Sequence, residues 1–125
     1  MNLVKAFFHF IFKIFKTKSV EIKHVQRLSA FDTVLIKPSI EASNDLLKYG
    51  TILIVKDGSI QKWARFICPC GCGQKQVISL QISHSPHWSL NTIGETVTLH
   101  PSVHVNGADG CGAHFFIRKN QIEWV

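Results

Sequence analysis

The chain has 125 residues, of which 46% are hydrophobic and 18% charged, so its composition fits one globular domain and excludes an intrinsically disordered chain. Its 14 basic and 8 acidic residues give a net charge of +6, but four of the lysines and none of the acids lie in the first 18 residues. The other 107 residues carry ten bases and eight acids, a net charge of only +2. Because a nucleic-acid-binding domain usually spreads its basic residues over the folded surface, this distribution argues against nucleic acid as a partner.

No apolar run reaches the roughly 18 residues that a membrane-spanning helix needs. The N-terminus also lacks the small-x-small cleavage site of a signal peptide, and lysines interrupt its apolar stretch. We therefore expect a cytoplasmic protein in a reducing environment, where cysteines serve as metal ligands or catalytic groups before they form disulfides.

Residues 1–18 are predicted to form an amphipathic helix with a narrow basic stripe and a wide aromatic face. At about 100° per residue, Lys5, His9, Lys13 and Lys16 fall on one stripe, and the phenylalanines and isoleucines between them cover the rest of the surface. The apolar part of this helix, residues 3–15, is only about 20 Å long, too short to cross a bilayer. Two interpretations stay open: residues 3–16 contact a membrane interface, or they pack into an apolar groove of a partner or of this chain.

From residue 19 onward the pattern changes to the alternation and β-branched runs that are typical of strands. Residues 39–49 are predicted to contain one or two helical turns, which Gly50 ends. The predicted strands are residues 20–23, 33–36, 51–55, 61–67, 76–82, 95–99, 114–118 and 121–125. Few helical segments separate these strands, so the predicted fold class is mainly β (α+β): a small antiparallel β domain at residues 19–125, built around a zinc site, with the N-terminal helix appended.

Three cysteines alternate with proline and glycine in the run Cys-Pro-Cys-Gly-Cys-Gly, at Cys68, Cys70 and Cys72. The fourth, Cys111, stands in a second glycine-flanked turn, with His114 three residues later. Zinc takes tetrahedral sulfur and nitrogen ligands, and glycine turns let backbone N–H groups approach thiolates. We therefore predict a zinc site with its ligands among these five residues, although this spacing is tighter than usual and not all three thiols of the run need bind one ion.

The histidines offer either ligands or proton carriers. If three thiols supply sulfur, His114 either closes the coordination sphere or leaves a position for water, and only an open site activates water. An enzyme also needs a base or proton shuttle near the metal. His100, with Ser102 as its hydrogen-bond partner, is the predicted shuttle, unless it only packs at a strand end. His84 and His87 are predicted to lie in a solvated loop, and the residues alone favour a structural zinc.

The order of these motifs resembles a bacterial family catalogued as domain of unknown function 6527. The resemblance extends from residue 66 to the end of the chain and rests on residues 68–73, 88–90, 98–103, 111, 114–118 and 122–124. The family motif has a serine immediately before its histidine, where this chain has Ala113. The resemblance implies a zinc-dependent peptidase encoded beside bacterial ubiquitin-like conjugation genes.

We therefore predict a zinc-binding protein that acts as a metal-dependent peptidase or hydrolase in a bacterial ubiquitin-like conjugation system. Its predicted partners are a ubiquitin-like protein or conjugation enzymes, and its predicted catalytic residues are His100, Ser102 and His114. The alternative is a non-enzymatic binding module whose zinc is structural and whose N-terminal helix docks to a partner or membrane. Three protein ligands plus solvent would favour the enzyme, and four protein ligands would favour the binding module.

Overall fold

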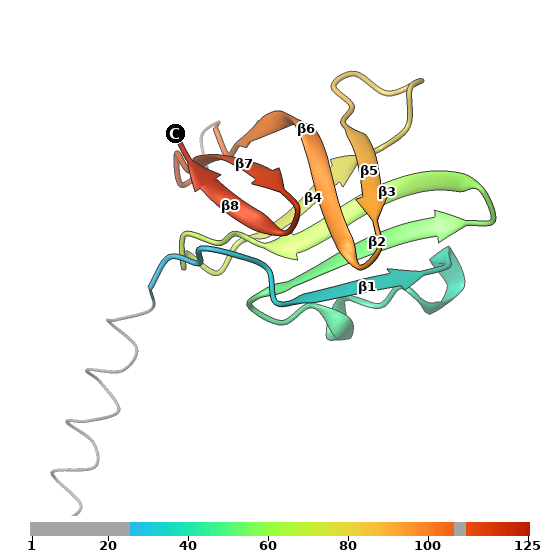
Figure 1. Ribbon diagram of the computed structural model, residues 1–125, viewed down its shortest axis with the longest axis horizontal. Helices are drawn as coiled ribbons and strands as arrows, with labels where there is room; N and C mark the ends of the chain where they lie inside the picture. The colour runs from blue at the N-terminus through green and yellow to red at the C-terminus, as the bar shows by residue number, and fades with distance from the viewer. Residues whose placement is uncertain (1–25, 107–109) are drawn as a thin grey trace, which may run out of the picture.

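The computed structural model describes residues 26–106 and 110–125, which form a sandwich of two four-stranded sheets (Figure 1). The first sheet contains, in order, β1 (Thr33–Lys37), β2 (Thr51–Asp57), β3 (Ile60–Ile67) and β4 (Lys75–Ser79). The second contains, again in chain order, β5 (Ser89–Ile93), β6 (Thr96–His104), β7 (His114–Arg118) and β8 (Gln121–Trp124). The mainly β fold class is therefore confirmed, while the predicted helix at residues 1–18 and the predicted strand at 20–23 lie outside the described residues.

The core lies between the two sheets, where their inward-facing side chains meet. Phe66 of β3 packs edge-on against Phe115 of β7 and against Phe31, with ring centroids 6.1 and 5.4 Å apart. Each of these three rings has at most 2% of its surface exposed. Buried and less buried residues alternate along β3, β6 and β7, the period-two pattern of strands with one face in a core. The other face of the second sheet therefore points outward.

β1 and β2 run parallel, whereas the prediction was a mostly antiparallel domain and the other described strand pairs are antiparallel. A parallel pair needs a crossover, which residues 38–50 supply with two 3-10 turns, η1 (Ser39–Glu41) and η2 (Asn44–Leu46). The crossover covers the outer face of the first sheet, where Leu47 packs against Leu53 and Val55. Because both faces of β2 are covered, its first five residues are all buried.

β6 contains a bulge that interrupts its pairing with β7. Leu99 pairs with Ile117 and Val103 pairs with Phe115, so four steps along β6 face two steps along β7. The extra residues belong to the segment 100–102, which was predicted to follow the end of a strand. A bulge breaks the regular alternation of side chains and re-aims those next to it. The bulge therefore decides which way the side chains of residues 100–102 point.

β5 has no counterpart among the predicted strands. It is an edge strand of its sheet and only Leu90 of this strand packs against the core, so its sequence carries almost no hydrophobic alternation. In the described ranges, no helix has both the length and the apolar character needed to cross a bilayer.

Candidate active site and metal centre

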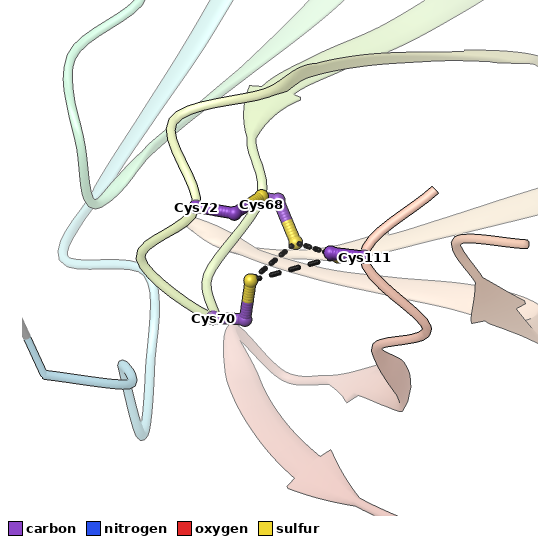
Figure 2. Close-up of side chains that lie close together, drawn as sticks. All are labelled: Cys68, Cys70, Cys72 and Cys111. Atoms are coloured by element: carbon purple, nitrogen blue, oxygen red, sulfur yellow. Dashed lines mark hydrogen bonds between the residues drawn. The ribbon is translucent and has the colours of Figure 1, made fainter. Parts of the chain in front are cut away.

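Four cysteine thiols meet where two turns from different sheets approach each other (Figure 2). Cys68, Cys70 and Cys72 lie on the turn between β3 and β4, and Cys111 precedes β7. Their four sulfur atoms lie within 4.8 Å of one another. The Sγ atom of Cys68 is 3.4 Å from that of Cys70 and 3.6 Å from that of Cys111. The structure thus brings together all four cysteines that were predicted as metal ligands.

Hydrogen bonds and glycine conformations build the three-cysteine turn. The N–H group of Gly71 donates to the carbonyl oxygen of Cys68 at 3.3 Å. Gly71 and Gly73 have φ values of 92° and 83°, a left-handed conformation that residues with a Cβ atom rarely adopt. The hydroxyl of Tyr49 donates to the carbonyl oxygen of Pro69 at 2.8 Å, which ties the turn to the crossover. The left-handed conformation explains why glycines occupy positions 71 and 73 of this turn.

The thiols influence one another's protonation. Burial raises the pKa of the Cys68 thiol well above its ordinary value and also raises the pKa of the Cys70 thiol. At Cys111, burial opposes ionisation, but hydrogen bonds from the Ala113 N–H and from the thiols of Cys70 and Cys68 outweigh it and lower the pKa of Cys111. Four thiolates this close repel one another, so full ionisation requires a cation at their centre.

The donor set fits zinc. With zinc–sulfur distances of about 2.3 Å, a tetrahedral arrangement places neighbouring sulfurs about 3.8 Å apart, close to the spacing in this cluster. Four cysteines complete the coordination sphere and leave no position for a reacting water, which is the pattern of a structural site. His114, also predicted as a ligand, is not part of the cluster.

His114 lies beside Ser102 instead. The Nε2 atom of His114 is 2.9 Å from the Oγ atom of Ser102, and both side chains are half-buried. Ser102 comes from the bulge of β6, and His114 is the first residue of β7. A serine hydroxyl within hydrogen-bond distance of an imidazole nitrogen is the arrangement that activates serine as a nucleophile. Two of the three predicted catalytic residues thus form a pair that does not involve the cysteine cluster.

Two further residues adjoin this pair, and neither was predicted as a site residue. The indole Nε1–H of Trp88 donates to the carbonyl oxygen of Ser102 at 3.2 Å, and its backbone N–H donates to Ser79 in the first sheet at 2.8 Å. The imidazole of His104 stacks on that of His114, with centroids 4.7 Å apart and planes 20° apart. Trp88 lies in one of the quoted motifs, which is the only signal in the sequence that pointed to it.

The remaining predicted histidines have other surroundings. His100 is exposed, and no hydrogen bond within the described residues involves its ring; its carbonyl oxygen accepts a bond from the Ser89 hydroxyl at 3.3 Å. His84, predicted to be solvated, is half-buried: its Nδ1 is 2.7 Å from the Ser79 Oγ and its ring packs on Trp63. Because Ser79 is only 7% exposed, this second serine–histidine pair is closed to a substrate and stabilises the loop.

Ala113 stands where the motif of the resembled family has serine. It is 5% exposed and belongs to the core between the sheets. Successive side chains of an extended chain point to opposite faces, so position 113 faces the core while His114 faces outward. A hydroxyl at position 113 would therefore not reach the imidazole, and the serine within reach is Ser102.

These features define a class: a small β-sandwich with a serine–histidine pair of the hydrolase type on one sheet and a separate four-cysteine cluster joining the sheets. The chain belongs to the family described as bacterial ubiquitination-like system serine protease (BubE), whose model matches residues 39–125. Searches among curated proteins and among solved structures gave no match.

The family match refines the predictions made from the sequence. A bacterial domain family tied to a ubiquitination-like system is confirmed, under this description rather than as domain of unknown function 6527, and the match begins at residue 39 rather than 66. The description names a serine protease, so it does not support the predicted metal-dependent peptidase. Membrane contact by residues 3–16 finds no support in the match, and those residues lie outside the described ranges.

Proposed function

We propose that this protein is a serine peptidase in which Ser102 is the nucleophile and His114 the general base. The observation that carries the proposal is the 2.9 Å approach of Ser102 Oγ to His114 Nε2 on the outward face of the second sheet. The family description supplies the reaction class and the setting, a bacterial ubiquitination-like system. We infer that the substrate is an extended peptide segment of a protein in that system, such as a ubiquitin-like protein or a conjugation enzyme.

The proposed reaction proceeds in two stages. His114 Nε2 accepts the proton of the Ser102 hydroxyl while the Oγ atom attacks the carbonyl carbon of the peptide bond. The resulting imidazolium then donates this proton to the departing amine as the carbon–nitrogen bond breaks, and an acyl-serine remains. In the second stage His114 accepts a proton from water, the hydroxide attacks the ester, and the Ser102 oxygen leaves and regains a proton.

The metal has no part in these steps. A zinc ion held by four cysteines would supply structural cross-linking, because its coordination sphere is complete. We therefore assign zinc, bound by Cys68, Cys70, Cys72 and Cys111, a role in the fold and not in the chemistry.

Two neighbours hold the catalytic pair in place. Trp88 restrains the backbone of Ser102, and the stacked His104 restrains the ring of His114.

A fluorophosphonate probe tests this proposal without knowledge of the substrate, because it forms a phosphorus–oxygen bond with an activated serine and releases fluoride. We expect one adduct, located at Ser102 by peptide mass spectrometry. Ser102→Ala should abolish it, and His114→Ala should slow it by about 10²–10⁴, the usual contribution of a general base. Ser79→Ala is the matched control, since it disrupts the other serine–histidine pair and should leave the labelling rate of the folded protein unchanged.

Two results would contradict the proposal: no labelling of the folded wild-type protein, or labelling that persists in Ser102→Ala. Either result would return the chain to the alternative, a zinc-containing binding module without catalytic activity. Far-ultraviolet circular dichroism of each variant separates loss of the nucleophile from loss of the fold.

A further inference from the structure

The proposed catalytic pair shares the outward face of the second sheet with a groove of about 540 Å³. Strand register aligns the side chains of this face in rows that cross the sheet. One such row contains Asn91, Thr98 and Arg118. Asn91 pairs directly with Thr98. Because Leu99 pairs with Ile117 in an antiparallel ladder, the neighbouring residue Thr98 lies opposite Arg118. His114 and Arg118 lie on one strand four residues apart, so both point outward. The groove and the pair are therefore parts of one surface.

Arg118 is held in place at this groove by two neighbours. Its guanidinium lies over the ring of Phe116, 4.3 Å from the centroid, and its Nη1 is 2.7 Å from a carboxylate oxygen of Glu123. Within the described part of the chain no other hydrogen bond involves the Arg118 side chain, which is 54% exposed, so its remaining N–H donors are available to a ligand. A guanidinium positioned in advance loses little side-chain freedom when it binds a ligand.

The charges of the groove favour an anionic ligand. Arg118 and Lys119 contribute two positive charges to the groove, and Glu123 contributes one negative charge. The other residues that line the groove are uncharged, so its net charge is positive. The backbone N–H of Lys119 donates to the Thr98 hydroxyl at 2.9 Å, which fixes the backbone at the end of β7. The planar fork of an arginine matches a carboxylate, which it can bind through two parallel hydrogen bonds.

The distance between the two sites sets the position of that carboxylate in a substrate. Four residues separate His114 from Arg118 along β7, or about 13 Å at the strand rise of about 3.3 Å per residue. An extended peptide that follows the strand has the same rise. A carboxylate bound at Arg118 would therefore belong to a residue about four positions from the bond that is cleaved.

We propose that Arg118, assisted by Lys119, is a specificity-determining subsite that binds an acidic side chain of the substrate about four residues from the scissile bond. The inference rests on the proposed peptidase function. The substrate is then an acidic peptide segment that lies along β7. Ser102 and His114 act on the scissile bond at one end of this segment, and Arg118 binds the acidic side chain at the other end.

Cleavage of a peptide library by the full, zinc-loaded chain, with the products sequenced by mass spectrometry, tests the proposal. We expect aspartate or glutamate to be enriched about four residues from the cleaved bonds. The preference is measured as the ratio of kcat/KM for an acidic peptide to kcat/KM for its neutral analogue. Arg118→Gln should reduce this ratio by about tenfold, the size expected for the loss of a charged hydrogen bond. Lys75→Gln, which removes an exposed lysine on the other sheet, is the matched control and should leave the preference unchanged.

A second variant gives a change of the opposite sign. Glu123→Gln leaves the Arg118 charge uncompensated, so it should strengthen the preference for acidic peptides, and raised salt should weaken that preference in both proteins. Cleavage without acidic enrichment, or enrichment that survives Arg118→Gln, would overturn the subsite while leaving the peptidase in place. Absence of cleavage and of fluorophosphonate labelling would instead overturn the proposed function itself.

Discussion

Burial separates two serine–histidine pairs that look alike by distance. Ser79 and His84 are 2.7 Å apart and Ser102 and His114 are 2.9 Å apart. Ser79 also accepts a hydrogen bond from the backbone N–H of Gln81 and is buried, so its oxygen already serves the local structure. Ser102 is half-buried on an outward face, where a substrate carbonyl can approach its hydroxyl.

At the residue scale, Trp88 is predicted to position the nucleophile. Trp88→Phe keeps an aromatic ring against the core but removes the Nε1–H bond to the carbonyl oxygen of Ser102. A small displacement of a reacting group costs up to about 10² in rate, so we expect fluorophosphonate labelling to slow by roughly ten- to a hundredfold. The labelling rate should keep its wild-type pH profile, because His114 remains the base. A wild-type rate in Trp88→Phe would show that the indole does not position Ser102.

Among the secondary-structure elements, β6 has the most direct influence on the active site. Ser102 lies in the bulge of this strand, and its hydroxyl is 2.9 Å from His114. Without the two extra residues of the bulge, the single residue between Leu99 and Val103 would stand opposite Phe116. We therefore predict that the pair requires the bulge, consistent with the frequent occurrence of bulges beside active sites.

Deleting His100 and Pro101 tests this role of the β6 bulge. The shortened strand can pair regularly with β7, so zinc content and circular dichroism should match the wild type. Labelling at Ser102 should fall to the level of His114→Ala, because the hydroxyl no longer reaches the imidazole. Pro101→Ala keeps the length of the strand and serves as the control that should still react. Normal labelling of the deletion variant would contradict the geometric requirement.

At the scale of the whole molecule, the cysteine cluster joins the two sheets. Three of its thiols follow β3 of the first sheet, and Cys111 precedes β7 of the second. A metal ion would therefore cross-link the two sheets near the start of β7. One of its ligands, Cys111, is only three residues before His114. The core between the sheets connects them as well.

Removal of the metal should destabilise the fold, because structural zinc contributes on the order of 10 kcal/mol, comparable to the whole stability of a small domain. Cys70→Ser and Cys111→Ser should lower zinc content equally, as measured by elemental analysis. During chelation, labelling should disappear together with the near-ultraviolet circular dichroism signal. Activity lost while the fold remains would indicate a catalytic metal, and a metal-free protein of unchanged stability would exclude the site.

Local sequence patterns were enough to predict the mainly β class and to single out the four cysteines that could hold a metal ion. Alternating and β-branched runs mark strands wherever one or both faces are buried, as in β2 and β3. Cysteines separated by glycine and proline mark a ligand turn before any long-range contact is known. Ser102 and His114 were also identified as candidates, but as parts of a metal site.

How these residues combine depends on contacts between distant parts of the chain. The strand register around the β6 bulge places Ser102 beside His114. The fold also brings Cys111 to Cys70, 41 residues earlier in the chain, without including that histidine in the cluster. Strand register, bulges and the burial of Ser79 or Ala113 depend on contacts between distant segments. Such contacts have no local sequence pattern, because a shift of one residue turns every side chain to the opposite face of a sheet.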